Sequence, residues 1–157
     1  MQDSENKKDL LLARVPKTEI MNRSAYEFFA GLDEVGRPFW ESDMKSRRPV
    51  FSDANGIGWG IRAVYNPGLH RYLLSMFHAL GDGDGDGSWG LFDAPEPWGP
   101  WTTVAYYTNW IDPVPKFGFT FPAKWMSVDG TQMYLVFSGI GVYDSINVIK
   151  ATLSVRR

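Results

Sequence analysis

The feature that most constrains the fold is the stretch from Trp89 to Val104, in which two short apolar runs flank a corner rich in proline and glycine. Pro95, Pro97 and Pro100 lack the N–H group that a sheet ladder needs, so the chain has to leave the sheet at this corner. β-Branched and aromatic residues resume directly after it, which is typical of a returning strand. We interpret the two runs as the outer half of a four-stranded antiparallel sheet.

Three tryptophans lie in the same stretch, at positions 89, 98 and 101. Together they offer more apolar area than a surface hairpin needs. We therefore expect Trp98 and Trp101 to be structural, with Trp101 packed between neighbouring sheets.

The composition favours an all-β chain with many turns. Its 157 residues include 16 glycines, 10 prolines and 15% aromatic residues.

A net charge of −2 gives no electrostatic footprint for nucleic acid or an anionic membrane, so we expect neither partner. The absence of cysteine excludes disulfides and Cys-based zinc sites. The localisation stays open, since the sequence carries no transmembrane-length apolar run and no visible signal peptide.

Period-2 patterns predict most of the remaining strands. The clearest runs from Trp59 to Tyr65, turns at Asn66–Gly68 and returns over residues 71–77. Further strands are expected over residues 9–15, 24–32, 39–40, 119–128, 133–138 and 147–153, with a helical turn over 17–23 and a loop over 51–58. We expect a mobile N-terminus over residues 1–8 and a single domain over residues 9–157.

A weak internal repeat suggests how the sheets are arranged. A hairpin followed by a strand with a late alanine occurs before Ala94 and again before Ala151, 57 positions apart, with Leu11–Ala13 as a third copy of that strand. Radially repeated four-stranded sheets are β-propellers, with common repeats of roughly 40–50 residues. We therefore expect a partial β-propeller of about two and a half four-stranded antiparallel blades, with a β-sandwich as the alternative.

Three longer strings resemble an uncharacterised microbial family: residues 65–74, residues 90–101, and residues 121–127 followed by 135–139. That family is similar to the five-bladed propeller glycoside hydrolases of families 32, 43 and 68, and this chain matches its C-terminal half. The resemblance implies a carbohydrate-binding protein or a glycosidase relative. The related hydrolases place three carboxylates around the propeller axis, and the resemblance assigns no full set of them to this chain.

Loops that share one end of the predicted blades hold the first group of candidate ligand-binding residues. Chain direction alternates at each turn, so the loops near residues 51–58, 78–88, 107–117 and 139–145 should lie on the same face, where sites on rigid scaffolds usually lie. These candidates are Asp53, Asn55, His78, Asp112 and Asp144. The alternative is that Asp and Asn are there as ordinary turn residues.

A second group of candidates falls on predicted innermost strands. Trp59, Arg62 and Lys124, with Trp125 beside the last, supply the aromatic faces and cationic donors that a carbohydrate or anionic ligand needs. The alternative is that the tryptophans pack between sheets and the basic residues fill a polar axial channel.

The glycine–aspartate run over residues 81–87 matches the front of a calcium loop, with Asp82, Asp84 and Asp86 at alternate positions. Asp93 falls at the twelfth position, but the strand before it should carry its side chain about 15 Å away at about 3.3 Å per residue. Calcium is therefore a possible cofactor and a plain acidic hairpin loop is the alternative; we expect no other cofactor.

Two functions remain open at this level. One is a carbohydrate-binding propeller fragment or glycosidase relative; the other is a structural or protein-interaction module without catalytic activity. We also expect a homo-oligomer, most simply a dimer, because a partial propeller leaves open sheet edges and bare apolar faces that invite pairing with a second copy.

Overall fold

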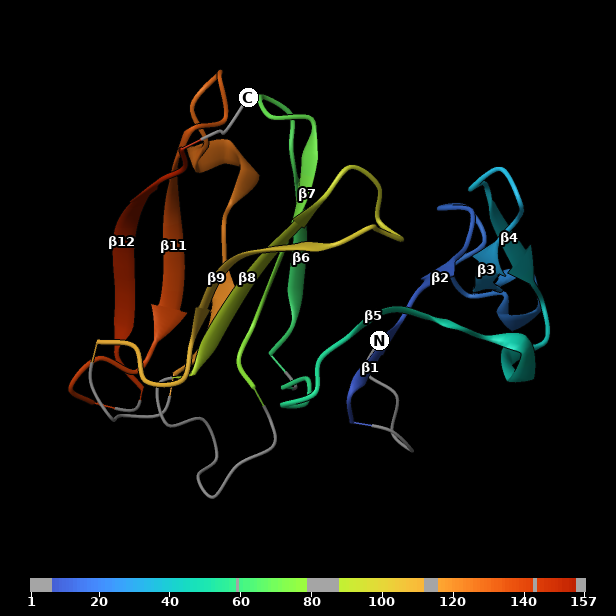
Figure 1. Cartoon of the computed structure of the whole chain (residues 1–157), viewed down its shortest axis with the longest axis horizontal. Helices are drawn as coiled ribbons and strands as arrows, with labels where there is room; N and C mark the ends of the chain where they lie inside the picture. Colours follow the sequence, from blue (N-terminus) through green and yellow to red (C-terminus); the bar gives the residue numbers. More distant parts are fainter. Residues whose placement is uncertain (1–6, 59, 79–87, 112–115, 143, 155–157) are drawn as a thin grey trace.

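The computed structural model describes residues 7–58, 60–78, 88–111, 116–142 and 144–154. Its strands form four antiparallel sheets, none of which closes on itself (Figure 1). The all-β class expected from the composition and the turn pattern is confirmed at this level. No helix in these ranges is long and apolar enough to cross a lipid bilayer.

The sheets are built from strands that mostly follow one another in the chain. The first sheet pairs β1 (Asp9–Leu11) with β5 (Pro49–Ser52). The second contains β2 (Ala13–Arg14), β3 (Glu27–Leu32) and β4 (Pro38–Glu41). The third, the central sheet, has the order β6 (Arg62–Asn66), β7 (Arg71–Met76), β8 (Trp89–Ala94) and β9 (Thr102–Tyr107). The fourth contains β10 (Phe117–Thr120), β11 (Gln132–Ser138) and β12 (Ile146–Thr152).

Short 3-10 helices occupy three of the described connections. They are η1 (Arg23–Ala25), η2 (Met44–Ser46) and η3 (Ala123–Trp125). Asn22 and Asp43 cap the first two, because each side chain accepts a hydrogen bond from the backbone two residues on.

The central sheet is the four-stranded meander that the sequence predicts. β8 and β9 are adjacent and antiparallel, joined through the corner that contains the three prolines, and β9 lies at the sheet edge. The hairpin between β6 and β7 also falls where the Asn66–Gly68 turn was predicted.

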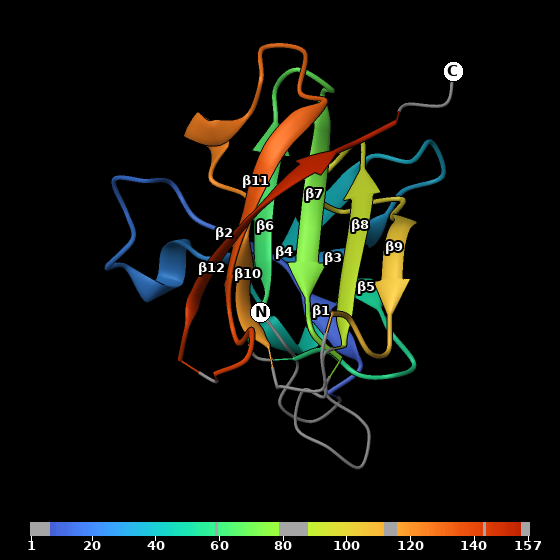
Figure 2. The ribbon, with the colours of Figure 1, turned by 90° about the vertical axis from the view of Figure 1, so that its left-hand side faces the viewer.

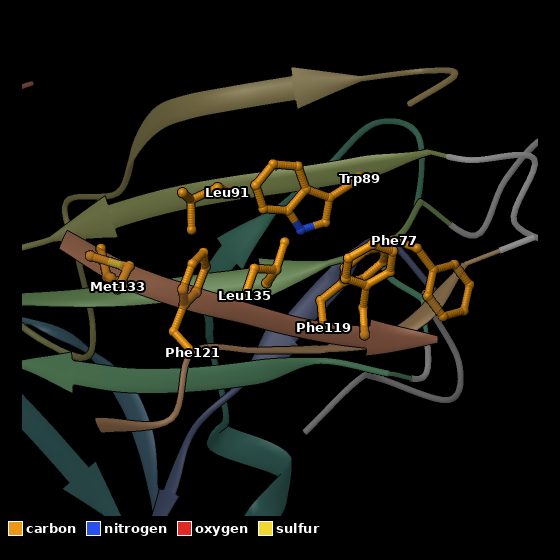
Figure 3. Packing of buried hydrophobic residues seen from close by; sticks show 9 residues of the cluster. Phe77, Trp89, Leu91, Phe119, Phe121, Met133 and Leu135 are labelled. Carbon is orange, nitrogen blue, oxygen red and sulfur yellow. The ribbon is translucent and has the colours of Figure 1, made fainter. Parts of the chain in front are cut away.

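The central sheet buries both of its faces. On one face Leu73, Trp89 and Leu91 pack against Phe119, Leu135 and other residues of the fourth sheet (Figure 3). On the other face Leu74, Met76 and Phe92 pack against Leu10 of β1, with Phe51 of β5 beside them. The first, third and fourth sheets are therefore successive layers, and Figures 1 and 2 show β10–β12 on one side of the central sheet and β1 and β5 on the other.

Several predicted boundaries are wrong in instructive ways. The run over residues 9–15 divides at Leu12, because β1 pairs with β5 whereas β2 pairs with β3. Phe51 and Ser52, expected in a loop, belong to β5 and form ladder pairs with Leu10 and Asp9. The strand expected over residues 24–32 begins only at Glu27, because η1 precedes it.

The strand expected over residues 119–128 ends at Thr120. Pro122 cannot donate to a ladder, and η3 follows it directly. Lys124 and Trp125 therefore lie on η3. The expectation that they lie on an innermost strand is wrong.

The tryptophans of the corner connect separate sheets. Trp101 is half-buried against the Leu74–Phe92 face of the central sheet, with its ring centroid 6.3 Å from that of Phe51. Trp98 meets Trp40 of β4 edge-on at the same centroid distance of 6.3 Å. The expected packing of Trp101 between sheets agrees with this arrangement.

One buried polar side chain joins the central sheet to the fourth. Asn66, fully buried at the end of β6, donates from Nδ2 to the carbonyl of Gly130 at 2.9 Å and accepts at Oδ1 from the Leu69 backbone at 3.2 Å. Gly130 has φ +73°, and a Cβ there would lie 2.2 Å from Asn66 Oδ1.

We predict that Asn66→Ala lowers the free energy of unfolding by about 1–3 kcal/mol, because it leaves the buried Gly130 carbonyl and the half-buried Leu69 N–H without their partner. Urea denaturation measures this change. Asn109→Ala, which truncates an exposed asparagine, is the matched control and should change stability by less than about 0.5 kcal/mol. Equal stabilities for the two variants would contradict the inferred role of Asn66.

Candidate functional site

A buried polar cluster lies where the first sheet meets the central sheet. The carboxylate of Asp53 accepts hydrogen bonds from the Tyr106 hydroxyl at 3.1 and 3.2 Å. Asn55 donates from Nδ2 to the same hydroxyl at 2.6 Å. His78 Nδ1 lies 3.3 Å from Asp53 Oδ2, and its ring stacks on Tyr106 with centroids 4.0 Å apart. Three of the predicted ligand-binding residues, Asp53, Asn55 and His78, are thus brought together.

The turn after β5 positions Asp53. Side chains alternate along an extended strand, so Asp53 shares the inward face of Phe51 while Ser52 points to the opposite face. Its Oδ1 accepts from the Asn55 backbone N–H at 2.8 Å, and its carbonyl accepts from Gly56 at 3.0 Å. This Asx-type turn holds the carboxylate toward the central sheet.

The N-terminal segment fixes the same turn from the other side. The carbonyls of Lys8 and Lys7, which we expected in a mobile terminus, accept from the N–H groups of Asp53 at 2.9 Å and Ile57 at 2.7 Å. The turn is therefore anchored on two sides.

His78 continues the alternation of β7. Leu74, Met76 and His78 follow one another at every second position on the face that meets the first sheet. Gly90 on β8 leaves room for the imidazole, because a Cβ there would lie 3.1 Å from His78 Cε1. The ring is therefore placed by the same pattern that forms the core.

A β-bulge brings Tyr106 into the cluster. Leu91 pairs with Ala105 but the next residue, Phe92, pairs with Thr103, so Val104 is an extra residue on β9. The bulge changes the alternation, and Thr103 and Tyr106 come to share one face of the sheet. Re-aiming a side chain in this way is a frequent role of bulges beside functional sites.

Burial controls the protonation of the cluster. Desolvation is the main cause that raises the pKa of Tyr106, so the phenol stays protonated and donates to Asp53. Desolvation also lowers the pKa of His78, and this effect exceeds the opposing influence of the Asp53 carboxylate. Near neutral pH the imidazole is uncharged. The 3.3 Å contact with Asp53 has ion-pair distance, and among the described residues neither ring nitrogen has a hydrogen-bond partner.

An open cavity of about 470 Å³ adjoins this cluster, between β5 and the outer strands of the central sheet. Its size falls within the range of small-molecule pockets, about 300–1,000 Å³. Asp53 and Tyr106 lie at one end, and Trp101 lies beyond Thr103 along β9. The lining residues are Val50, Phe51, Ser52, Asp53, Ala54, Phe92, Trp101, Thr103 and Tyr106.

The other described candidates lie apart from this cavity. Arg62 is exposed, and its Nη1 donates to the carbonyl of the preceding residue, Ile61, at 2.8 Å. Asp144 is exposed in the connection from β11 to β12. Lys124 is exposed on η3, with Nζ 5.7 Å from the Trp125 ring centroid, and is not among the residues that line the cavity.

The remaining candidates lie outside the described residues. They are Trp59, Asp112, Asp82, Asp84 and Asp86. Within the described ranges, no group of three or more His, Asp or Glu side chains gathers as a metal site would require. Calcium binding by the aspartates of residues 82–86 stays a prediction.

Sequence reasoning missed the aromatic half of the site. Phe51 was assigned to a loop, Trp101 to a structural role only, and Tyr106 to no role. Strict alternation would place Ala105 on the cavity face together with Trp101 and Thr103. The β-bulge shifts the alternation and places Tyr106 there instead.

Comparison of the chain with models of protein families, with curated proteins and with solved structures gave no match in any of the three. The functional argument therefore depends on the geometry of the site.

The lowered pKa of His78 predicts a specific pH dependence of stability. The unfolded chain binds a proton at the ordinary value of 6.5, whereas the folded protein binds it only at lower pH. Stability therefore rises with pH between the two pKa values and is lost as pH falls below about 6.5. Denaturation followed from about pH 7 to about pH 5 should show a shallower pH slope for His78→Asn than for the original protein.

His70→Asn is the control, since His70 is exposed, and an asparagine tolerates its positive φ of 52°. This variant should keep the original slope. Parallel curves for the original protein and His78→Asn would contradict a buried, neutral His78, whatever the absolute stability of the variant.

Proposed function

We propose that this protein is a carbohydrate-binding module whose ligand occupies the cavity between β5 and β9. The observation that carries the proposal is the combination of aromatic walls with a polar end in one hollow. Phe51 and Trp101 offer apolar faces against which a sugar ring stacks, whereas Asp53 and Thr103 offer hydrogen-bonding groups for its hydroxyls.

Preorganisation supports a binding role for this hollow. The Asp53 carboxylate is held by Tyr106 and by the Asn55 backbone before any ligand arrives. Phe51 packs against Phe92 with ring centroids 4.6 Å apart, so the wall is also fixed by its neighbours. A ligand therefore orders few side chains on binding, which favours affinity.

The proposal is binding and not hydrolysis. Glycoside hydrolysis uses two carboxyl groups about 5–9.5 Å apart. Among the described residues, Asp53 alone supplies a carboxylate to the cavity lining.

We further propose that the sheets are successive blades of a partial β-propeller, as the resemblance to families 32, 43 and 68 implies. The support is the central sheet, which carries a separate apolar core on each face. A two-layer β-sandwich has one core between two sheets, whereas stacked blades bury both faces of an inner blade.

Isothermal titration with glucose, galactose, xylose and glucosamine tests the binding function. At least one sugar should bind, and Trp101→Ala should weaken that binding by roughly tenfold or more, because truncating a central aromatic contact removes a large share of the binding energy.

Trp125→Ala is the matched control, because Trp125 is exposed on η3 outside the cavity. It should leave the affinity unchanged. Absence of binding for all four sugars, or an equal loss in both variants, would contradict the proposed site.

A second proposal is self-association through β12. This strand lies at the edge of the fourth sheet and pairs with β11 over seven residues without a bulge or a proline. Ile146 and Val148 on it are 85% and 52% exposed. Regular, apolar edge strands of this kind favour pairing with another chain. Two copies of β12 would pair antiparallel and join the fourth sheets of the two chains.

Light scattering at micromolar concentration should therefore give twice the chain mass of 17.8 kDa. Val148→Lys should yield monomers, because it places charge on the associating strand. Val128→Lys should keep the dimer, since Val128 is fully exposed in the connection before β11. A monomeric original protein would overturn this proposal and leave the sugar site untouched.

A further inference from the structure

The Asp53 carboxylate is buried, and its one basic neighbour among the described residues is His78, with Nδ1 3.3 Å from Oδ2. The residue is 8% exposed, and no lysine or arginine in the described ranges lies within ion-pair distance of it. Its recorded side-chain contacts are with Tyr106, the Asn55 backbone and the uncharged ring of His78. Burying an anion is unfavourable unless a cation or several donors compensate it. The Tyr106 hydroxyl and the Asn55 N–H supply two donors, and burial disfavours the charged form of His78, so a cationic ligand would add compensation that the cluster lacks.

Aromatic rings surround the space beside that charge. Phe51, Phe92, Trp101 and Tyr106 all line the cavity. Phe51 and Trp101 meet at 78°, and Phe92 and Tyr106 meet at 76°, so these walls face different directions. Aromatic faces attract cations through the ring quadrupole, and several rings around one space form the cage that binds organic ammonium groups.

The lining that the described residues form contains no lysine or arginine. The cavity therefore combines one carboxylate, four aromatic rings, one of which is the phenol of Tyr106, and the hydroxyl of Thr103. This set disfavours an anionic ligand and favours one that combines a positive charge with apolar and hydroxyl surfaces.

We propose that the cavity binds an amino sugar, with its ammonium group beside Asp53 and its ring against the aromatic walls. The inference rests on the proposed sugar-binding function and names the class of sugar. Thr103, which lines the cavity, then offers a hydroxyl that can bond the remaining sugar hydroxyls.

His78 has a permissive role in this arrangement. Its burial disfavours the imidazolium form, so near neutral pH it adds no positive charge that would repel the ligand. The ammonium group then provides the charge compensation that His78 does not.

The test compares glucosamine with glucose by isothermal titration at about pH 7, where an amine of this type is mostly protonated. The two sugars differ only in the group at one ring carbon. Glucosamine should bind about tenfold more tightly or better, since a desolvated ammonium gains from both the rings and the carboxylate. Choline, a quaternary ammonium without a sugar ring, is the third probe.

Asp53→Asn keeps the acceptor oxygen for Tyr106 and removes the charge, so it should abolish the preference for glucosamine over glucose. Asp144→Asn makes the same change at an exposed carboxylate away from the cavity and should preserve the preference. Melting temperatures establish that both variants fold, and the selectivity of the original protein decides the question if Asp53→Asn does not fold.

The outcomes separate the two proposals. Equal binding of glucose and glucosamine overturns the amino-sugar inference and leaves the sugar-binding function standing. Tight binding of choline with no binding of either sugar supports the cationic site and overturns its assignment to sugars. No binding of any of the three probes overturns the amino-sugar inference, and binding of galactose or xylose would then still support the broader function.

Discussion

The rest of the structure depends on the burial of both faces of the central sheet. β7 and β8 carry buried apolar side chains on both faces of the sheet, so each face needs its own partner layer. The fourth sheet covers one face and the first sheet the other, and burial of this kind supplies about 25 cal/mol per Å² of apolar surface. Because both interfaces are apolar, the polar cluster of Asp53, His78 and Tyr106 lies where one of them ends.

The candidate site lies where one of these interfaces ends. β1 and β5 cover Leu74, Met76 and Phe92. The chain then turns at Asp53, and His78 follows two residues after the end of β7. Beyond that point the apolar packing gives way to a carboxylate, an imidazole and a phenol. The cavity is thus an extension of the core interface, which explains why its walls are aromatic and its end is charged.

The site also combines rigidity with electrostatic imbalance. Tyr106 and the Asx-type turn hold Asp53, and stacking holds His78, so the groups are positioned in advance. Burial disfavours the charged form of His78, so within the described residues no lysine or arginine offsets the Asp53 carboxylate. Binding of a cationic ligand would relieve that imbalance, whereas a purely structural cluster gains nothing from retaining it.

The sequence by itself determined the all-β class and the central meander, because turn residues and period-2 patterns are local properties of the chain. It also grouped Asp53, Asn55 and His78 on one face, but together with Asp144, which lies apart from them. The pairing of β1 with β5 and the packing of Trp101 against Phe51 were decided by tertiary structure, since both depend on residues far apart in sequence. Tyr106 is the clearest case. Strict alternation excluded it from the site, and it joins Asp53 only because an extra residue in β9 reverses the side-chain phase where that strand pairs with β8.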